Sequence, residues 1–586
     1  MTGLSGRSFT TICGSLVLAA IVTTCVVPSV LSEKIAALPF EDLLWEGSEQ
    51  SNPSSLLDLV MSSWSGHIAH DFRKRVSEES RETQQDLSQI LSILPRDSID
   101  HYEASAVKYA LHHFFLRRLG WNVKGLDPAG AAWNGTSPSM AQILELLPES
   151  LRMLLGKRLT TSGLDVGDTT VFALLIKHLL HAQGSLRLAK AYSFWDLNPT
   201  LAIPAGDAQK VLTAYMGGFV ADRDLAKINR TKMKEFLADK FEKIFPRWDE
   251  LRAYMNTTMA KFFPVDASPD EAVVFATVNK AREAIDEGFG PWQFNDCDDL
   301  RQMLLKREED GSGRVELQTF YQAGLEGNFQ FRETPDWLRS LGALDESSPD
   351  RPRVIIENYV AGASNAVGAS PYLDNRCMSP CEALYSQLER QFRKAGVEPE
   401  DLAAFVMTMA SATVSAPHQI SDTQLHRLQE MAYQHNGDIP IAGRLFAQWM
   451  HHEYPRECPF PHEAGTTQPQ GLTARQRSMP GSLLASLQEM KRIVKQKMRR
   501  GHPTKLAPWS SKEELPAIYD DDPTPMVWTR VQFGLVLIVF LLMILHTAPK
   551  LRSSVFGGGQ PKQANSALKG KHDTANAVVT EGRQSK

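Results

Sequence analysis

The segment KREEDGSGRVELQTF, Lys306 to Phe320, decides the fold that the sequence predicts for the middle of the chain. Its centre, Asp310-Gly311-Ser312-Gly313, consists of turn-forming residues, and its glycines accept the left-handed backbone of a sharp turn. Helical spacing fits the residues before the turn, from Asp298 to Lys306, and resumes near Leu317 with Phe320 on the core face. We therefore predict a helix–loop–helix unit.

The spacing of oxygen-bearing residues in this loop resembles that of an EF-hand calcium loop, with ligands at positions 1, 3, 5, 7, 9 and 12 and glycine at position 6. With Gly313 at position 6, the first five ligands are Glu308, Asp310, Ser312, the carbonyl of Arg314, and Glu316. Glu308 is longer than the usual aspartate, and Thr319 replaces the bidentate glutamate of position 12. The resemblance therefore implies weak or vestigial calcium binding, and no other cofactor is assigned.

EF-hands usually occur in pairs, so the resemblance implies a second unit. The segment WLRSLGALDESSPDRPRVIIENYV, Trp337 to Val360, lies at the expected place. Its loop has acidic and hydroxyl side chains but two prolines and no glycine at the turn, so we expect it to have lost its ligand geometry. Val354 or Ile355 is expected to pair with Val315 across a short β-bridge. The pair then serves mainly as a packing module.

Helix signals dominate the remaining folded part. Ser-Pro-Asp-Glu at residues 268–271 predicts a helix start, because serine caps and proline suits the first helical position, and this helix is expected to run to Gly288. Ser-Pro-Cys-Glu at residues 379–382 predicts a similar start, with the helix running toward Gly396. Gly120 is expected to end one helix, and Ser421 with Gln424 to begin another.

The two ends of the chain predict a membrane topology. Residues 12–27 form an apolar run after Arg7, which is typical of a cleaved signal peptide, with an uncleaved anchor as the alternative. Residues 531–548 form a second apolar run of about the length needed to cross a bilayer. It is preceded by three aspartates and followed by a basic tail, so we expect the C-terminus to be cytoplasmic. The protein is then a type I single-pass membrane protein of the secretory pathway or cell surface.

The predicted fold class is all-α: a helical ectodomain with a central EF-hand-like helix–loop–helix pair, plus one C-terminal transmembrane helix. The predicted parts are a signal peptide (residues 1–32), an N-terminal helical region (33–290), the EF-hand-like pair (291–365), a C-terminal helical region (366–470), a basic stalk helix and linker (471–526), a transmembrane helix (527–548) and a disordered basic cytoplasmic tail (549–586).

Cysteines and glycosylation motifs fit a lumenal or extracellular body. Removal of the signal peptide leaves four cysteines, which allow two disulfides in three alternative pairings. These disulfide candidates are Cys297, Cys377, Cys381 and Cys458. The N-glycosylation candidates are Asn134, Asn229 and Asn256, each in an Asn-x-Thr motif.

A cluster of potential metal ligands supports an alternative function. The segment GRLFAQWMHHEYPRECPFPH, Gly443 to His462, contains His451, His452, Glu453, Cys458 and His462, although their spacing matches no established zinc motif. The alternative is a membrane-anchored metal-dependent hydrolase. Histidine pairs at residues 112–113 and 178–181 are expected to be satisfied core or boundary residues. The sequence has no nucleophile elbow, phosphate-binding loop or dinucleotide fingerprint, which does not favour an enzyme.

The segments WNGTSPS, YLDNRCMSPCEALYSQLE and GRLFAQWMHHEYPRECPFPH resemble parts of uncharacterised single-pass membrane proteins of microbial eukaryotes. That resemblance implies the same topology and a helical ectodomain, and it brings no known activity. The net charge of −5 gives no sign of nucleic-acid binding. We therefore expect a binding ectodomain, with a protein partner at the ectodomain or the stalk helix; a calcium-regulated receptor that signals through its tail is a further alternative.

Overall fold

The computed structural model describes residues 55–516 of the chain, with internal gaps. The gaps are residues 65, 127–140, 232, 234, 236–240, 242–244, 265–270, 309, 328–329, 369, 468–482 and 497–506. The predicted signal peptide, the transmembrane segment, the cytoplasmic tail and Asn134 lie outside the described residues. All described residues belong to one compact unit.

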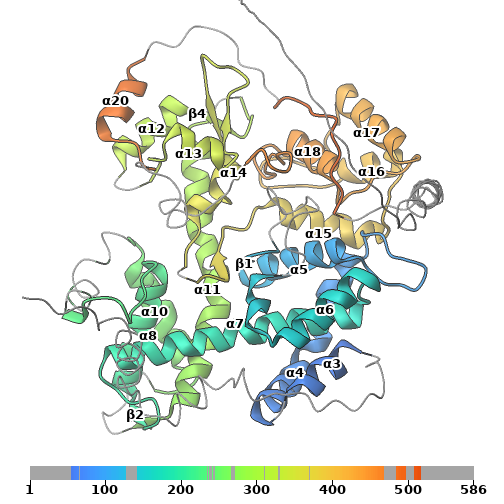
Figure 1. The fold of residues 1–586 in the computed structure, drawn as a ribbon. Coiled ribbons are helices and arrows are strands. Elements are labelled where there is room, and N and C mark those ends of the chain that lie inside the picture. The colour runs from blue at the N-terminus through green and yellow to red at the C-terminus, as the bar shows by residue number, and fades with distance from the viewer. Residues whose placement is uncertain are drawn as a thin grey trace, which may run out of the picture. The chain divides into compact units, whose positions relative to one another are not determined.

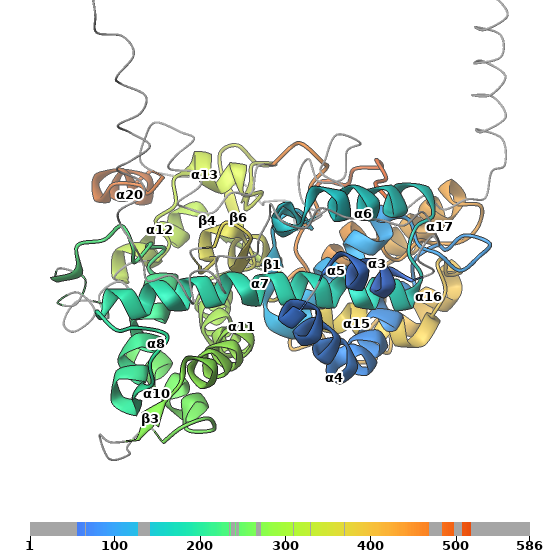
Figure 2. The same ribbon diagram turned by 60° about the horizontal axis from the view of Figure 1, so that its bottom comes forward.

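Helices of the N-terminal part pack around one long central helix, α7 (Val166–Phe194). The side chain of Asp165 caps this helix by accepting a hydrogen bond of 2.7 Å from the backbone N–H of Asp168. Figures 1 and 2 show α7 extending across this part, with α8 near one end and α4 near the other. The other elements of this part are α3 (Leu56–Ser63), α4 (Gly66–Leu91), α5 (Ala104–Leu119), the 3-10 helix η2 (Gln142–Leu146), α6 (Glu149–Thr161), α8 (Ala205–Val220) and α10 (Trp248–Met259).

One helix, α11 (Phe275–Leu305), joins the N-terminal helices to the predicted helix–loop–helix pair without a break. It starts later than the predicted Ser268 and continues through Gly288 and Pro291, so the predicted end at Gly288 is wrong. The reason is packing: a Cβ on Gly288 would lie 2.2 Å from the Tyr254 hydroxyl. Gly288 therefore allows a close contact between helices and does not end the helix. The predicted boundary between residues 290 and 291 falls inside this helix.

Two helix–loop–helix units follow and pair through a short sheet. The order is β4 (Arg314–Glu316), α12 (Leu317–Glu326), α13 (Pro335–Ser340), β5 (Leu344–Asp345), β6 (Arg353–Ile355) and α14 (Ile356–Val360). β4 pairs antiparallel with β6, and β5 pairs with the other edge of β6. Val315 lies opposite Val354, one of the two partners that the sequence predicts for it. Both side chains are fully buried in a core of their own.

The C-terminal part consists of shorter helices. They are η4 (Ala363–Asn365), α15 (Cys381–Phe392), α16 (Pro399–Val406), α17 (Asp422–Gln434) and α18 (Arg444–Glu453). Ser421 caps α17 by accepting a hydrogen bond from the backbone N–H of Gln424, as predicted. α15 ends earlier than predicted, because Arg393 adopts a left-handed backbone (φ 49°) before Gly396 is reached.

Short strand pairs connect distant parts of the sequence. β1 (Trp121–Val123) follows α5 and pairs antiparallel with β7 (Leu373–Asn375). β2 (Ile203–Pro204) pairs with β3 (Ala272–Val273). Gly120 ends α5 in the left-handed conformation (φ 67°), as the sequence predicts. A Cβ at Gly120 would lie 2.7 Å from the Cα of Gly290, so the end of α5 crosses α11 at a contact that admits only glycines.

Part of the predicted stalk packs against the body instead. α20 (Leu487–Val494) lies beside α12 in Figure 1, and Met490 is completely buried in the core of the helix–loop–helix pair. The Gln318 side chain donates a hydrogen bond of 2.9 Å to the carbonyl of Ile493. The apolar face of this helix therefore covers the pair.

The membrane helix in the predicted fold class requires correction. Among the helices of residues 55–516, outside the gaps given above, none is both long enough and apolar enough to cross a membrane. The described part is mostly helical with short strand pairs, and the transmembrane helix predicted at residues 527–548 is not supported.

Candidate functional site

Several of the five predicted calcium ligands have partners within the protein. Glu308 accepts a hydrogen bond of 3.0 Å from the backbone N–H of Gly313 and forms an ion pair with Arg456. Asp310 is exposed and has a left-handed backbone (φ 61°), whereas Ser312 is buried. Burial raises the pKa of Glu308, although Arg456 opposes that rise.

The side chains at the two remaining loop positions also have charged partners. Glu316 forms an ion pair with Arg351. The buried guanidinium of Arg314 lies 3.4 Å from a carboxylate oxygen of Asp345 in the second loop. Within the part of the chain that the structure describes, no group of three or more His, Cys, Asp or Glu side chains is arranged to hold a metal ion.

The turn after α18 is packed against the first loop. A Cβ on Gly313 would lie 1.9 Å from the carbonyl oxygen of Pro455, so only glycine permits this approach. The guanidinium of Arg456 lies beside Gly311 and bonds to Glu308. A fixed arginine cation thus pairs with the carboxylate that sequence reasoning assigned to calcium.

The predicted metal cluster at residues 451–462 is likewise occupied by protein contacts. His451 Nδ1 lies 2.8 Å from the carbonyl oxygen of Cys458, and His462 Nε2 lies 2.7 Å from that of Gly342. His452 Nδ1 bonds to Arg427. Burial lowers the pKa values of His451 and His452 to about 3, so both are neutral at physiological pH.

Glu453 is the acidic residue of that cluster. Among the contacts that the structure describes, it forms no hydrogen bond to the three histidines of the cluster. Burial raises its pKa to about 7, against the opposing effect of Arg427.

The four cysteines form two disulfides, which selects one of the three pairings that the sequence allows. Cys297 pairs with Cys377 across a Cα–Cα distance of 5.5 Å, and Cys381 pairs with Cys458 across 4.7 Å. The short segment 377–381 is therefore tied to α11 on one side and to the turn after α18 on the other.

Two of the three glycosylation candidates lie among the described residues. Asn229 is exposed at the start of a helical turn. Asn256 lies within α10, where its side-chain oxygen accepts a hydrogen bond of 2.9 Å from Gln209. Of these two, Asn229 has the more accessible setting.

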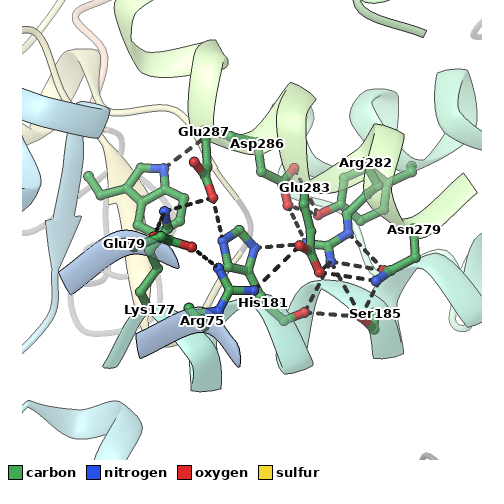
Figure 3. A network of polar contacts seen from close by, with 12 residues as sticks. Arg75, Glu79, Lys177, His181, Ser185, Asn279, Arg282, Glu283, Asp286 and Glu287 are labelled. Atoms are coloured by element: carbon green, nitrogen blue, oxygen red, sulfur yellow. Dashed lines mark hydrogen bonds and ion pairs between the residues drawn. The ribbon is translucent and has the colours of Figure 1, made fainter. Parts of the chain in front are cut away.

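A buried network of charged residues joins α4, α7 and α11 (Figure 3). At its centre is Arg282, whose side chain is 0% exposed. Its guanidinium lies 2.8 Å from Asp286 and 3.1 Å from Glu283, and it donates a hydrogen bond of 2.9 Å to Asn279. Gly184 on α7 leaves space for it, since a Cβ there would lie 2.2 Å from an Arg282 nitrogen.

The rest of this network is paired in the same way. Glu287 accepts from His181 Nε2 at 2.8 Å and pairs with Lys177 at 3.0 Å. Burial alone would raise the pKa of Glu287, but His181 and Lys177 together lower it to about 2. Arg75 pairs with Glu79. Sequence reasoning missed this network because its partners lie on helices far apart in the chain.

A cleft of about 360 Å³ lies where the N-terminal helices, the helix–loop–helix pair and the C-terminal part meet. Most of its wall is apolar. The wall is built from α5 (Tyr109, His112, His113 and Leu116), the end of α14 and residues 361–363, the disulfide segment 376–382 with Tyr385, the start of α18 (Arg444 and Ala447), and residues 459–467 and 514–516.

One chain of polar contacts reaches the cleft wall. His113 Nδ1 lies 2.9 Å from a carboxylate oxygen of Glu382, and Arg117 Nε lies 2.6 Å from the same oxygen. The other end of Arg117 forms a two-pronged pair with Glu389, at 2.8 and 2.9 Å. Burial would raise the pKa of Glu382, but His113 and Arg117 hold it well below its usual range.

The position of His113 is further fixed by a ring contact. Its centroid lies 4.3 Å from that of Tyr109 on the same helix. The histidine pair at residues 112–113 was expected to be structural, and the only sequence signal for this chain of contacts was the glutamate of the Ser-Pro-Cys-Glu helix start.

Burial affects a second carboxylate in the cleft wall. Glu357 of α14 is completely buried and pairs with Arg301 of α11. Burial raises its pKa to about 7 in spite of that arginine. The cleft wall therefore combines two paired carboxylates with apolar and aromatic surface.

In comparisons with known proteins, no protein-family model, no curated protein and no solved structure matches the chain.

Proposed function

We propose that this protein is a binding protein whose ligand, a small and largely apolar molecule, occupies the cleft between α5, α14, α15 and α18. The observation that carries the proposal is the cleft itself, about 360 Å³ in volume with a mostly apolar wall. Ligand sites are typically concave and apolar, with a few polar groups that fix orientation.

The disulfides support the proposal because both contribute to the wall. Cys377 and Cys381 line the cleft, and their partners lie on α11 and after α18. Covalent links at this point limit the movement of the three parts that form the walls, and a preformed site loses less free energy on binding than a flexible one.

A fluorescence titration with the neutral apolar probe N-phenyl-1-naphthylamine tests this function. The partly exposed Ala447 lies in the wall, so Ala447→Phe should fill part of the cleft and weaken probe binding at least about tenfold, about 1.4 kcal/mol. The matched control is Ala404→Phe, which makes the same change at an exposed position of α16. Equal affinities for both variants would refute a ligand site in this cleft.

We further propose that the helix–loop–helix pair is a degenerate EF-hand-like module that serves packing. The support is the β4–β6 pairing together with Arg456, whose guanidinium bonds to Glu308. Under this proposal Thr319→Glu alone leaves calcium affinity low, because the arginine cation remains. Thr319→Glu combined with Arg456→Gln should create or tighten binding, measured by calorimetric titration with millimolar calcium. Unchanged affinity in the double variant contradicts the EF-hand-like assignment.

We also propose that the body matures in an oxidising compartment of the secretory pathway. The two disulfides support this, because such bonds persist mainly in oxidising environments. Asn229, exposed in its Asn-Arg-Thr motif, is the glycosylation site we expect to be used. Glycosidase treatment should increase the gel mobility of the protein from a eukaryotic host, and Asn229→Gln should reduce that change. No mobility change in the parent protein contradicts this localisation.

A further inference from the structure

We propose that His113 is the polar recognition group of the cleft, accepting a hydrogen bond at Nε2 from a hydroxyl or N–H group of an otherwise apolar ligand. This inference rests on the proposed ligand-binding function and specifies the class of ligand. The tautomer of His113, the position of its free nitrogen and the charge around it support the inference.

The tautomer follows from Glu382. An ionised carboxylate only accepts hydrogen bonds, so the contact of 2.9 Å places a proton on Nδ1 of His113. In neutral imidazole the other nitrogen then carries a lone pair and acts as an acceptor. Arg117 binds the same carboxylate and keeps it ionised. Glu382 and Arg117 are thus positioning residues, and His113 presents the acceptor.

Nε2 of His113 is available for a ligand. Among the residues that the structure describes, no group hydrogen-bonds to this nitrogen. The nitrogen is also not completely buried. The side chain is 14% exposed and lines the cleft. The ring is held on one side by Tyr109, at a centroid distance of 4.3 Å. The nitrogen is therefore both accessible and fixed in orientation.

The charges behind the ring favour a donor over an anion. Glu382 and Glu389 carry two negative charges, and Arg117 between them carries one positive charge. These three groups together have a net charge of about −1, which disfavours a carboxylate or phosphate beside them. A hydroxyl, phenol or amine N–H suits both this field and the lone pair.

Competition between two matched probes tests the inference. 2-Naphthol and 2-methoxynaphthalene have the same ring system, but only 2-naphthol donates a hydrogen bond. Each displaces N-phenyl-1-naphthylamine from the full-length protein, and we expect 2-naphthol to bind about three- to tenfold more tightly, as one hydrogen bond would produce. The difference should disappear in His113→Phe, while His426→Phe, the same change at an exposed position of α17 outside the cleft, should retain it.

A measurement on the unmodified protein does not depend on the folding of a variant. Excited 2-naphthol is a strong acid, and its O–H proton can move to a nearby base. If Nε2 accepts that proton, bound 2-naphthol emits mainly as naphtholate, and the proton returns after emission. Emission from the neutral form alone in the bound state would overturn the inference.

The outcomes separate this inference from the proposed function. Equal displacement by both probes, with probe binding still sensitive to Ala447→Phe, overturns the role of His113 and leaves the cleft as the binding site. Failure of both probes to displace N-phenyl-1-naphthylamine, with binding insensitive to Ala447→Phe, overturns both. Tighter binding of 2-naphthol that His113→Phe abolishes supports the inference.

Discussion

Two histidines in this protein make the same first contact. His181 on α7 lies 2.8 Å from Glu287, and His113 on α5 lies 2.9 Å from Glu382. In both cases a cation also binds the glutamate, so the carboxylate is shared between two positively polarised groups. The local chemistry of the two pairs is closely matched.

The surroundings of the second ring nitrogen differ. His181 Nδ1 lies 3.4 Å from a nitrogen of Arg282, and the side chain is only 3% exposed. Burial lowers the pKa of His181 more than Glu287 raises it, so the ring is neutral. Nε2 of His113 has no hydrogen-bond partner among the described residues, and its ring lines the cleft. A histidine–glutamate pair thus contributes to stability when both ring nitrogens of the histidine contact other protein groups. It can also contact a ligand when one ring nitrogen faces a cleft.

The largest expected effect tests the buried network that contains Arg282 and His181. Arg282→Met removes the cation that Asp286, Glu283 and Asn279 surround in a fully buried position. Breaking such a buried pair typically costs about 4 kcal/mol of unfolding free energy. Urea denaturation measures the loss, provided that a single transition is observed.

The control for this variant is Arg252→Met on α10. Arg252 is 50% exposed and pairs only with Asp249 in the described contacts, so its replacement should cost less than about 1 kcal/mol. A loss for Arg282→Met as small as that of the control contradicts the structural role of the network.

Removal of a disulfide tests whether that disulfide stabilises the cleft that His113 lines. The double variant Cys381→Ala/Cys458→Ala opens a loop with a sequence separation of 77 residues and should lower the unfolding free energy by about 3 kcal/mol. Because Cys381 lines the cleft, the affinity for N-phenyl-1-naphthylamine should fall as well. Arg282→Met should leave that affinity nearly unchanged wherever the protein is folded. Equal effects of the two variants on probe binding would remove the distinction between the two regions.

The third prediction concerns pH. The pKa of Glu287 falls from its ordinary value of 4.5 to about 2 on folding. Its contribution to stability is therefore present above about pH 4.5 and is lost as the pH falls toward 2. Glu287→Gln should be less stable than the parent protein by about 1–2 kcal/mol at pH 7, after allowance for partial exposure, and the difference should shrink toward zero near pH 2. A difference that does not change with pH would contradict the assigned ion pairs.

Local signals in the sequence predicted the parts of the fold that depend on neighbouring residues. Gly120 ends α5, Ser421 caps α17, and Val315 pairs with Val354. The first two depend on the backbone preferences of neighbouring residues, which a single sequence displays, and the third was implied by the resemblance to a pair of EF-hand loops. In the sequence, Gly288 could not be distinguished from a glycine that ends a helix. In the structure the helix continues, and Gly288 leaves space for the side chain of Tyr254.

Contacts between distant segments were not predictable in this way. Arg456 lies 148 residues from Glu308, and Arg117 lies 265 residues from Glu382. No local pattern indicates which arginine reaches which carboxylate. The carboxylate of Glu308 was therefore assigned to calcium, and the pairing of Glu382 with Arg117 was not predicted. Within residues 451–462 the opposite holds, because histidines that lie close together in the sequence have separate partners in space.

The smallest expected effect is a difference of about 1 kcal/mol between two variants, His181→Gln and His113→Gln, which compare the two histidines directly. His181 is buried with both nitrogens in contact with charged groups, so its loss should cost about 2 kcal/mol of unfolding free energy. His113 makes one described hydrogen-bonded pairing at a partly exposed position, and its loss should cost about 1 kcal/mol. Probe binding should respond in the reverse order, with only His113→Gln reducing the preference for 2-naphthol. Parallel urea denaturation and displacement titrations measure both quantities, and a His181→Gln variant that alters the probe preference would show that the two regions are not independent.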